Sequence, residues 1–278
     1  MKILKSSLLI AGLTLITTFY SCKDDDVPPV NEENPFENLV EHQKVFTGLG
    51  TYVKLYFEEE PFVGFNEVYI ALFDSASNEQ ITDGHIDMTP MMDMTTMKHS
   101  APFTNTGHHK DAKTGAFKGS VVFIMPSGAH GTWSLDLHVH NHVAQNDVEI
   151  SVPVTVKAKS ESRVHSFRRK ADSVAVFVTL IEPKSPEVGM NTITYGVYER
   201  KNMMEFPALE SVSMEIDPQM LSMGHGSPNN ENPVHTSNGV YEGKINYTMS
   251  GKWTIFTVLK DENQTLLGDT LKFETTLK

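Results

Sequence analysis

The 278-residue chain contains a single cysteine, Cys22. One cysteine excludes an internal disulfide framework and any zinc site built from Cys-x-x-Cys pairs. Basic residues are also few, with 23 Lys and Arg against 35 Asp and Glu and a formal net charge of -12. This balance argues against a nucleic-acid-binding protein, which needs a basic face to neutralise phosphates. The sequence lacks a Gly-x-Ser-x-Gly motif and a phosphate-binding loop, so we expect no enzymatic activity and name no catalytic residue.

Long apolar runs are scarce, and the one near the N-terminus covers Leu8–Ile16. It is shorter than the roughly 20 residues that span a bilayer. Lys2 and Lys5 precede the run and Cys22 follows it, which is typical of a bacterial lipoprotein signal. We therefore expect residues 1–21 to be a signal peptide and Cys22 to be lipidated. The protein would lie outside the cytoplasm, attached to the outer membrane on its periplasmic or surface face.

Residues 22–46 are rich in Asp, Glu, Asn and Pro and have few apolar residues. This composition is typical of a flexible tether. Its first residues, Lys23–Asp26, resemble an acidic signal that directs some lipoproteins to the outer face of the outer membrane. The same four residues are also consistent with an ordinary solvated linker.

The rest of the chain contains an internal repeat. Rare residue types recur at a spacing of 126 residues, followed by short gaps. The recurring pairs include Met94 and Met220, Met97 and Met223, His99 and His225, His109 and His235, and Trp133 and Trp253. The repeat predicts one domain over 47–158, a polar linker over 159–167 and a second domain over 168–278.

Both copies alternate apolar and polar residues, as in Val53–Phe57 and Trp253–Leu259. Short strands of period two, separated by turns rich in Gly, Pro and Asn, are typical of an all-β sandwich. About 110 residues per copy suits an immunoglobulin-like fold. We therefore predict two tandem immunoglobulin-like β-sandwich domains, with Trp133 and Trp253 in their cores.

Methionine and histidine are concentrated in one segment of each copy, with a shared Met-x-x-Met-x-His kernel. Neighbouring Pro and Gly residues predict that each kernel lies in a loop. Thioether sulfur suits Cu(I) and imidazole suits both copper states, so the kernels indicate copper sites. The alternative is a loop folded back with its Met side chains buried. The candidate ligands are Met94, Met97, His99 and His109 in the first copy, and Met220, Met223, His225 and His235 in the second.

A second histidine set, found only in the first copy, is His138, His140 and His142. Alternation on a strand places all three imidazoles on one face, which indicates a Cu(II) or Zn(II) site. Same-face residues are about 6.6 Å apart along a strand, too far for three to share one ion without bending. The alternative is a polar strand face with ordinary surface histidines. His85 and His108 belong to no predicted strand.

The second copy resembles the YtkA-like family, which is related to FixH-like proteins. The resemblance rests on Met220–Pro228, Gly239–Tyr241 and Thr248–Ile255. It covers most of the second copy, and the first copy more loosely. The first copy departs from the family pattern at Lys98 and Pro126. The resemblance implies small extracytoplasmic β-sandwich modules linked to copper handling.

These observations predict a lipid-anchored protein that captures, buffers or delivers copper. Its expected partners are the metal ion, a copper transporter or oxidase, and the membrane through the lipid anchor alone, with no nucleic acid. The alternative is a surface interaction or scaffold lipoprotein with tandem immunoglobulin-like domains and no metal.

Overall fold

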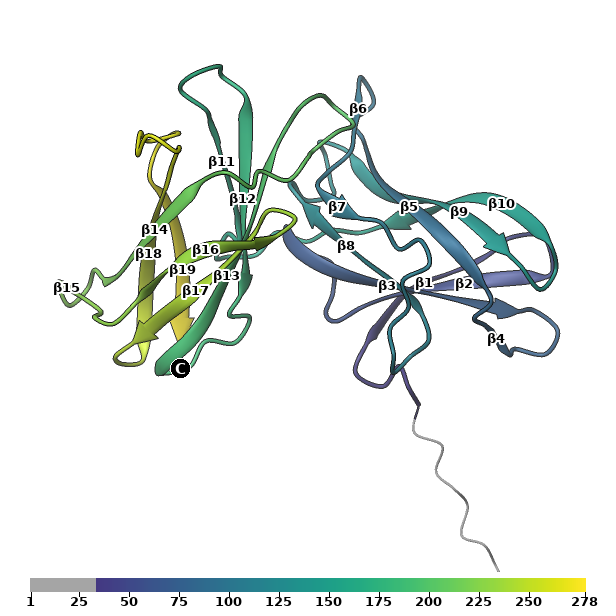
Figure 1. Ribbon diagram of the computed structural model, residues 1–278. Helices are drawn as coiled ribbons and strands as arrows, with labels where there is room; N and C mark the ends of the chain where they lie inside the picture. The colour runs from purple at the N-terminus through teal and green to yellow at the C-terminus, as the bar shows by residue number, and fades with distance from the viewer. Residues whose placement is uncertain (1–33) are drawn as a thin grey trace, which may run out of the picture. The chain divides into compact units, whose positions relative to one another are not determined.

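The computed structural model describes residues 34–278. The predicted signal peptide, Cys22 and the first part of the predicted tether lie outside these residues. Every regular element of the described part is a β-strand, and the paired strands are antiparallel (Figure 1). The predicted all-β, immunoglobulin-like fold is therefore confirmed. Within residues 34–278, no helix is long and apolar enough to cross a membrane.

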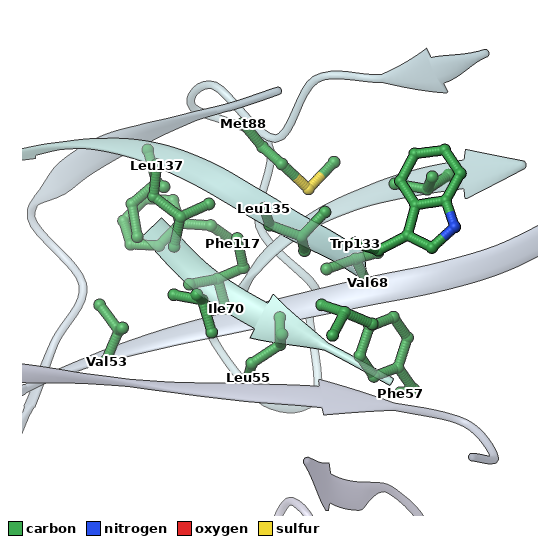
Figure 2. Packing of buried hydrophobic residues seen from close by; sticks show 14 of the residues in the cluster. Val53, Leu55, Phe57, Val68, Ile70, Met88, Phe117, Trp133, Leu135 and Leu137 are labelled. Atoms are coloured by element: carbon green, nitrogen blue, oxygen red, sulfur yellow. The ribbon is translucent and has the colours of Figure 1, made fainter. Parts of the chain in front are cut away.

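The first sandwich consists of two sheets. Its strands are β1 (Val40–Phe46), β2 (Thr51–Phe57), β3 (Gly64–Asp74), β4 (Gln80–Ile81), β5 (Gly84–Asp93), β6 (Lys98–His99), β7 (Phe103–Thr104), β8 (Phe117–Phe123), β9 (Thr132–Asn141) and β10 (Asn146–Val154). One sheet has the order β1-β2-β3-β8-β7, with β4 beside β3, and the other has the order β10-β9-β5-β6. Alternate side chains of both sheets form one core, in which Trp133 is buried. Figure 2 shows Met88, Leu135 and Leu137 on the core side of the second sheet.

The second sandwich repeats this plan. Its strands are β11 (Val164–Arg168), β12 (Ala175–Glu182), β13 (Gly189–Glu199), β14 (Ser213–Met220), β15 (His225–Gly226), β16 (Glu231–Ser237), β17 (Val240–Tyr247), β18 (Gly251–Lys260) and β19 (Leu271–Leu277). The sheets have the orders β11-β12-β13-β17-β16 and β15-β14-β18-β19. Trp253 is buried in a separate core, so the predicted place of both tryptophans is confirmed.

The ordered sandwich structure begins earlier than the sequence indicates. Val40–Phe46 lie within the predicted tether but form β1, which pairs with β2. Residues 164–167 lie within the predicted linker but belong to β11, which pairs with β12. Both are edge strands whose side chains are at most half-buried, so their apolar pattern is weak.

The Met-rich segments are only partly loops, which corrects the prediction. Pro90 lies inside β5 and Pro218 inside β14. The amides of Ile86 and Met88 point away from β9 and donate to the Gly107 carbonyl and Asn105 Oδ1. Pro90 follows Met88 by two residues, so its nitrogen faces the same side of the strand as these amides. That side is the sheet edge, where a proline loses no hydrogen bond to β9.

The strand pairing also changes the register of the repeat. Met92 lies opposite His99 in the first sandwich, and Met220 lies opposite His225 in the second. Met92, and not Met94, is therefore the structural counterpart of Met220. The connection from this Met to the His is two residues longer in the first sandwich, which is why a constant shift of 126 misaligned the strand before it.

A glycine stands two residues before each tryptophan, and its surroundings differ between the two sandwiches. Gly131 and Gly251 have φ values of 145° and 125°, which strain any L residue. A Cβ at Gly131 would lie 2.5 Å from the Asp93 carbonyl oxygen, whereas one at Gly251 would meet only Met220 Cε, at 3.1 Å. We expect Gly131→Ala to lower the free energy of unfolding by about 3 kcal/mol and Gly251→Ala by about 1 kcal/mol. Urea denaturation followed by circular dichroism would measure both, and equal losses would contradict the steric argument.

Candidate metal centre

Histidine and aspartate side chains gather on the outer face of the β10-β9-β5 sheet. Alternation along β9 buries Leu137 and Val139 in the core and turns His138 and His140 outward. On β5 the same alternation turns His85 and Asp87 outward. The four outward side chains are half-buried.

Strand register places these side chains in two rows across the sheet. In one row Asp147 of β10 lies opposite His140 of β9, which lies opposite His85 of β5. In the next row Glu149, His138 and Asp87 are opposite one another in the same way. Directly opposed residues in antiparallel strands have Cβ atoms about 5 Å apart, so side chains of three strands meet on this face.

Two Asp–His–His chains of contacts run through this cluster. His142 Nδ1 lies 3.1 Å from Asp83 Oδ1, and His142 Nε2 lies 3.2 Å from His85 Nδ1. In the second chain His140 Nδ1 contacts Asp147 Oδ1, and His140 Nε2 lies 3.2 Å from His138 Nδ1. Each carboxylate therefore orients one imidazole, whose other nitrogen faces a second imidazole.

The rings also contact one another directly. The His85 ring stacks on that of His140 with centroids 4.0 Å apart, and the centroids of His138 and His140 are also 4.0 Å apart. The ring of His108, from the segment between β7 and β8, has its centroid 4.5 Å from that of His85. Burial, followed by the neighbouring imidazoles of His140 and His108, lowers the pKa of His85 from its usual value. A neutral imidazole has the lone pair that a metal ion requires.

Two sets of three ligand atoms are close enough to bind one ion. The donor atoms of His85, Asp87 and His140 all lie within 4.8 Å of one another, as do those of His138, His140 and Asp147. Same-face residues of one strand are too far apart to share an ion if their side chains extend straight out. Here the imidazoles lean towards one another, and neighbouring strands contribute further ligands.

Only part of this cluster is predictable from the sequence alone. His138 and His140 belong to it as a same-face pair, and exposed His142 lies just beyond the end of β9. His85, Asp87 and Asp147 were not predicted, because they join the cluster through strand pairing. The alternation His85-x-Asp87 before the Met-rich segment is the sequence signal that could have located β5.

The same face is hollowed beside the cluster. A groove of about 950 Å³ follows the outer surface of β5, β9 and β10. His138 lines one part of it, together with Asp136, Glu149 and Ser151. The cluster is therefore open to solvent on one side.

The Met/His kernel of the second sandwich has its side chains in different surroundings. Met220 is a core residue, only 3% exposed, whereas Met223 is 64% exposed. His225 is half-buried, with its ring edge-on to Trp253 at 5.7 Å. The amides of Met223 and Gly224 donate to the Met220 carbonyl, which closes a tight turn between the two methionines.

The kernel of the first sandwich follows the same pattern. Met94 packs against the core, and Met97 is 47% exposed. His99 is 7% exposed and lies edge-on to Trp133 at 5.5 Å. Its Nδ1 donates to the Ser100 carbonyl at 2.7 Å, which leaves Nε2 as the nitrogen that can bind a metal.

The two remaining candidate ligands lie elsewhere. His235 is on β16, in the sheet opposite β14 and β15, where its ring packs on Tyr241 and its Nε2 accepts a hydrogen bond from the Gly239 amide. His109 is exposed in the segment between β7 and β8, and its amide donates to the Thr106 carbonyl. The participation of these residues and of the two kernels in metal binding stays a prediction.

Comparison with known proteins gives a family match for part of the chain. Residues 168–258 match the family model described as YtkA-like. They make up about a third of the chain and lie within the second sandwich, starting at the last residue of β11. The sequence prediction of this family is therefore confirmed for these residues, and the match does not extend to the first sandwich. No curated protein matches the sequence.

Solved structures with a similar arrangement include three bacterial proteins. They are the Escherichia coli adhesin FdeC, at 12% identity with a TM-score of 0.26, Yersinia pseudotuberculosis InvD, at 14% and 0.25, and the adhesin InvE of the same organism, at 12% and 0.24. The matches cover 86%, 79% and 79% of this chain. The chain spans 65%, 54% and 56% of the length of these structures.

Proposed function

Because residues 168–258 form a YtkA-like domain, we propose that the protein is an extracytoplasmic, lipid-anchored protein that captures, buffers or delivers copper. Copper is the cargo in this proposal, and the protein carries out no chemical turnover. The ion passes to a membrane transporter or oxidase. Lipidation of Cys22 would keep the protein at the outer membrane while the sandwiches remain in the aqueous phase.

The observation that carries the proposal is the cluster formed by His85, His138, His140, His142, Asp83, Asp87 and Asp147. Its donor set is imidazole and carboxylate, which suits Cu(II) and Zn(II). Two of the imidazoles are oriented by carboxylates, an arrangement typical of metal-binding histidines. The groove on one side gives an ion access from solvent, as exchange with a partner requires.

The Met/His kernels are proposed as weaker Cu(I) sites. Exposed Met97 and Met223 present thioethers to solvent, and each lies on the connection that leads to a histidine. Thioether and imidazole together favour Cu(I). Buried Met220 would have to leave its core packing to join such a site, which costs about 1.5–3 kcal/mol. This cost is why the histidine cluster is the principal site.

A competition titration with Cu(II) tests the proposal. The double variant His138→Ala/His140→Ala is expected to lower Cu(II) affinity by at least about 100-fold, because it removes two ligands. His130→Ala, which removes an exposed histidine outside the cluster, is the matched control and should bind as the wild type does. Equal, weak binding by all three proteins would overturn the proposal and favour the scaffold alternative.

A parallel titration with Cu(I) examines the kernels. Met223→Leu combined with His225→Ala is expected to weaken Cu(I) binding about tenfold and to leave Cu(II) binding at the cluster unchanged. Unchanged Cu(I) binding would assign the second kernel a packing role only.

A further inference from the structure

The two Asp–His–His chains have the same arrangement, although they lie on different residues. Asp83 orients His142 towards His85, and Asp147 orients His140 towards His138. We propose that the cluster binds two divalent ions side by side, one between His138 and His140 and the other between His85 and His142. The inference rests on the proposed metal-binding function and specifies how many ions the cluster takes.

The nitrogen–nitrogen distances fit this number. His140 Nε2 and His138 Nδ1 are 3.2 Å apart, and so are His142 Nε2 and His85 Nδ1. Two imidazole nitrogens that bind one ion at about 2.0 Å, with a tetrahedral angle between them, are roughly 3.3 Å apart. Both pairs are therefore already spaced as chelating pairs.

The hydrogen-bonding pattern supports the same assignment. A carboxylate can only accept, so Nδ1 of His142 and Nδ1 of His140 carry the protons that face Asp83 and Asp147. The lone pair of each Nε2 then points at the partner imidazole, and the two nitrogens of each pair share a proton. A divalent ion can take the place of that proton, because metal ligands must be deprotonated.

The charges of the surrounding side chains allow two ions to lie close together. Asp83, Asp87 and Asp147 contribute three negative charges at the cluster, and Asp87 is held in place by Asn105 Nδ2, which donates to its Oδ1 at 2.6 Å. Three carboxylates offset most of the four positive charges of two divalent ions. The stacked rings of His85 and His140 hold the two positions next to each other.

The donor chemistry identifies the class of ion. Imidazole with carboxylate, and no thiolate or thioether in the set, suits Cu(II) or Zn(II) better than Cu(I). His142 and Asp83 are exposed, so the position between His85 and His142 is the more accessible one. We expect that position to exchange its ion faster than the position between His138 and His140.

Stoichiometry measured with the full protein tests the inference. Zn(II) titration followed by calorimetry counts the ions, and electron paramagnetic resonance of the Cu(II)-loaded protein detects whether two of them are neighbours. His142→Ala and His138→Ala should each lose one equivalent, and the double variant should lose two. The wild-type spectrum should show the dipolar broadening of paired Cu(II) ions, which each single variant lacks. His130→Ala should retain both equivalents and the broadened spectrum.

Two further outcomes have distinct meanings. If the cluster binds one ion that both single variants abolish, the two-ion inference is wrong while the proposed function stands. If no variant changes the amount of bound metal, the proposed function itself fails. Asp83→Asn keeps all four imidazoles and should weaken only the position between His85 and His142, by about 10–100-fold. Circular dichroism of each variant separates loss of ligands from loss of the fold.

Discussion

Trp253→Ala is expected to lower the free energy of unfolding of the second sandwich by about 3–5 kcal/mol. The indole is fully buried, and its N–H donates to the Met249 carbonyl at 3.0 Å. Tyr247 and His225 pack against the ring at centroid distances of 5.6 and 5.7 Å. Truncation leaves a large cavity and an unpaired carbonyl, and the two penalties add.

Urea denaturation followed by circular dichroism would measure this loss. Trp253→Phe keeps most of the volume and should cost less, about 1–2 kcal/mol. Trp133, the one tryptophan left in both variants, reports the first sandwich separately through its fluorescence. A loss below about 1 kcal/mol for Trp253→Ala would show that the surrounding core collapses into the space.

The fold could be predicted because its signals are local. The alternation in Val53–Phe57 and in Trp253–Leu259 depends on neighbouring residues, and both segments are strands. Edge strands lack a strong pattern, and β1 and β11 were missed for that reason. Pro90 and Pro218 were predicted to lie in loops, but a proline fits in a strand when its nitrogen faces away from the neighbouring strand. Which side the nitrogen faces depends on partners far away in the chain.

The site was harder to predict because its ligands come from different strands. His138 and His140 share a face by simple alternation, and this part could be found in the sequence. The approach of His85 to His140 depends on the pairing of β5 with β9, residues far apart in the chain. Asp147 enters through the β9–β10 hairpin, whose register places it opposite His140. Local patterns contain neither register.

The Met/His kernels illustrate a different limit. The sequence shows that Met and His recur together, but the same recurrence follows from a packing arrangement that both sandwiches share. In both sandwiches a buried Met lies opposite a His that packs edge-on against the core Trp. Met92 and Met220 fill this position, and both are core residues. The recurrence of the buried Met and the His therefore has a structural cause. Packing does not explain the recurrence of Met97 and Met223, because both side chains are exposed.

The second large effect is expected from metal binding to the first sandwich. An ion that binds only the folded state stabilises it by about 2.7 kcal/mol when its concentration is 100 times the dissociation constant. For a domain of about 100 residues, this corresponds to a rise in Tm of roughly 10 °C. The rise should be large here because the ligands come from β5, β9 and β10, so an ion links three strands that separate on unfolding.

His140→Ala should remove the part of this rise that comes from the position between His138 and His140, because it removes one of the two imidazoles that chelate the ion there. The variant should fold normally in the absence of metal, since the side chain lies on the outer face and leaves the core of the sheet intact. Differential scanning calorimetry with and without Zn(II), and again after addition of EDTA, would measure the difference, with His130→Ala as the control. A shift of equal size in His140→Ala would mean that no ion binds between His138 and His140, because the loss of one of the two imidazoles there must reduce the stabilisation.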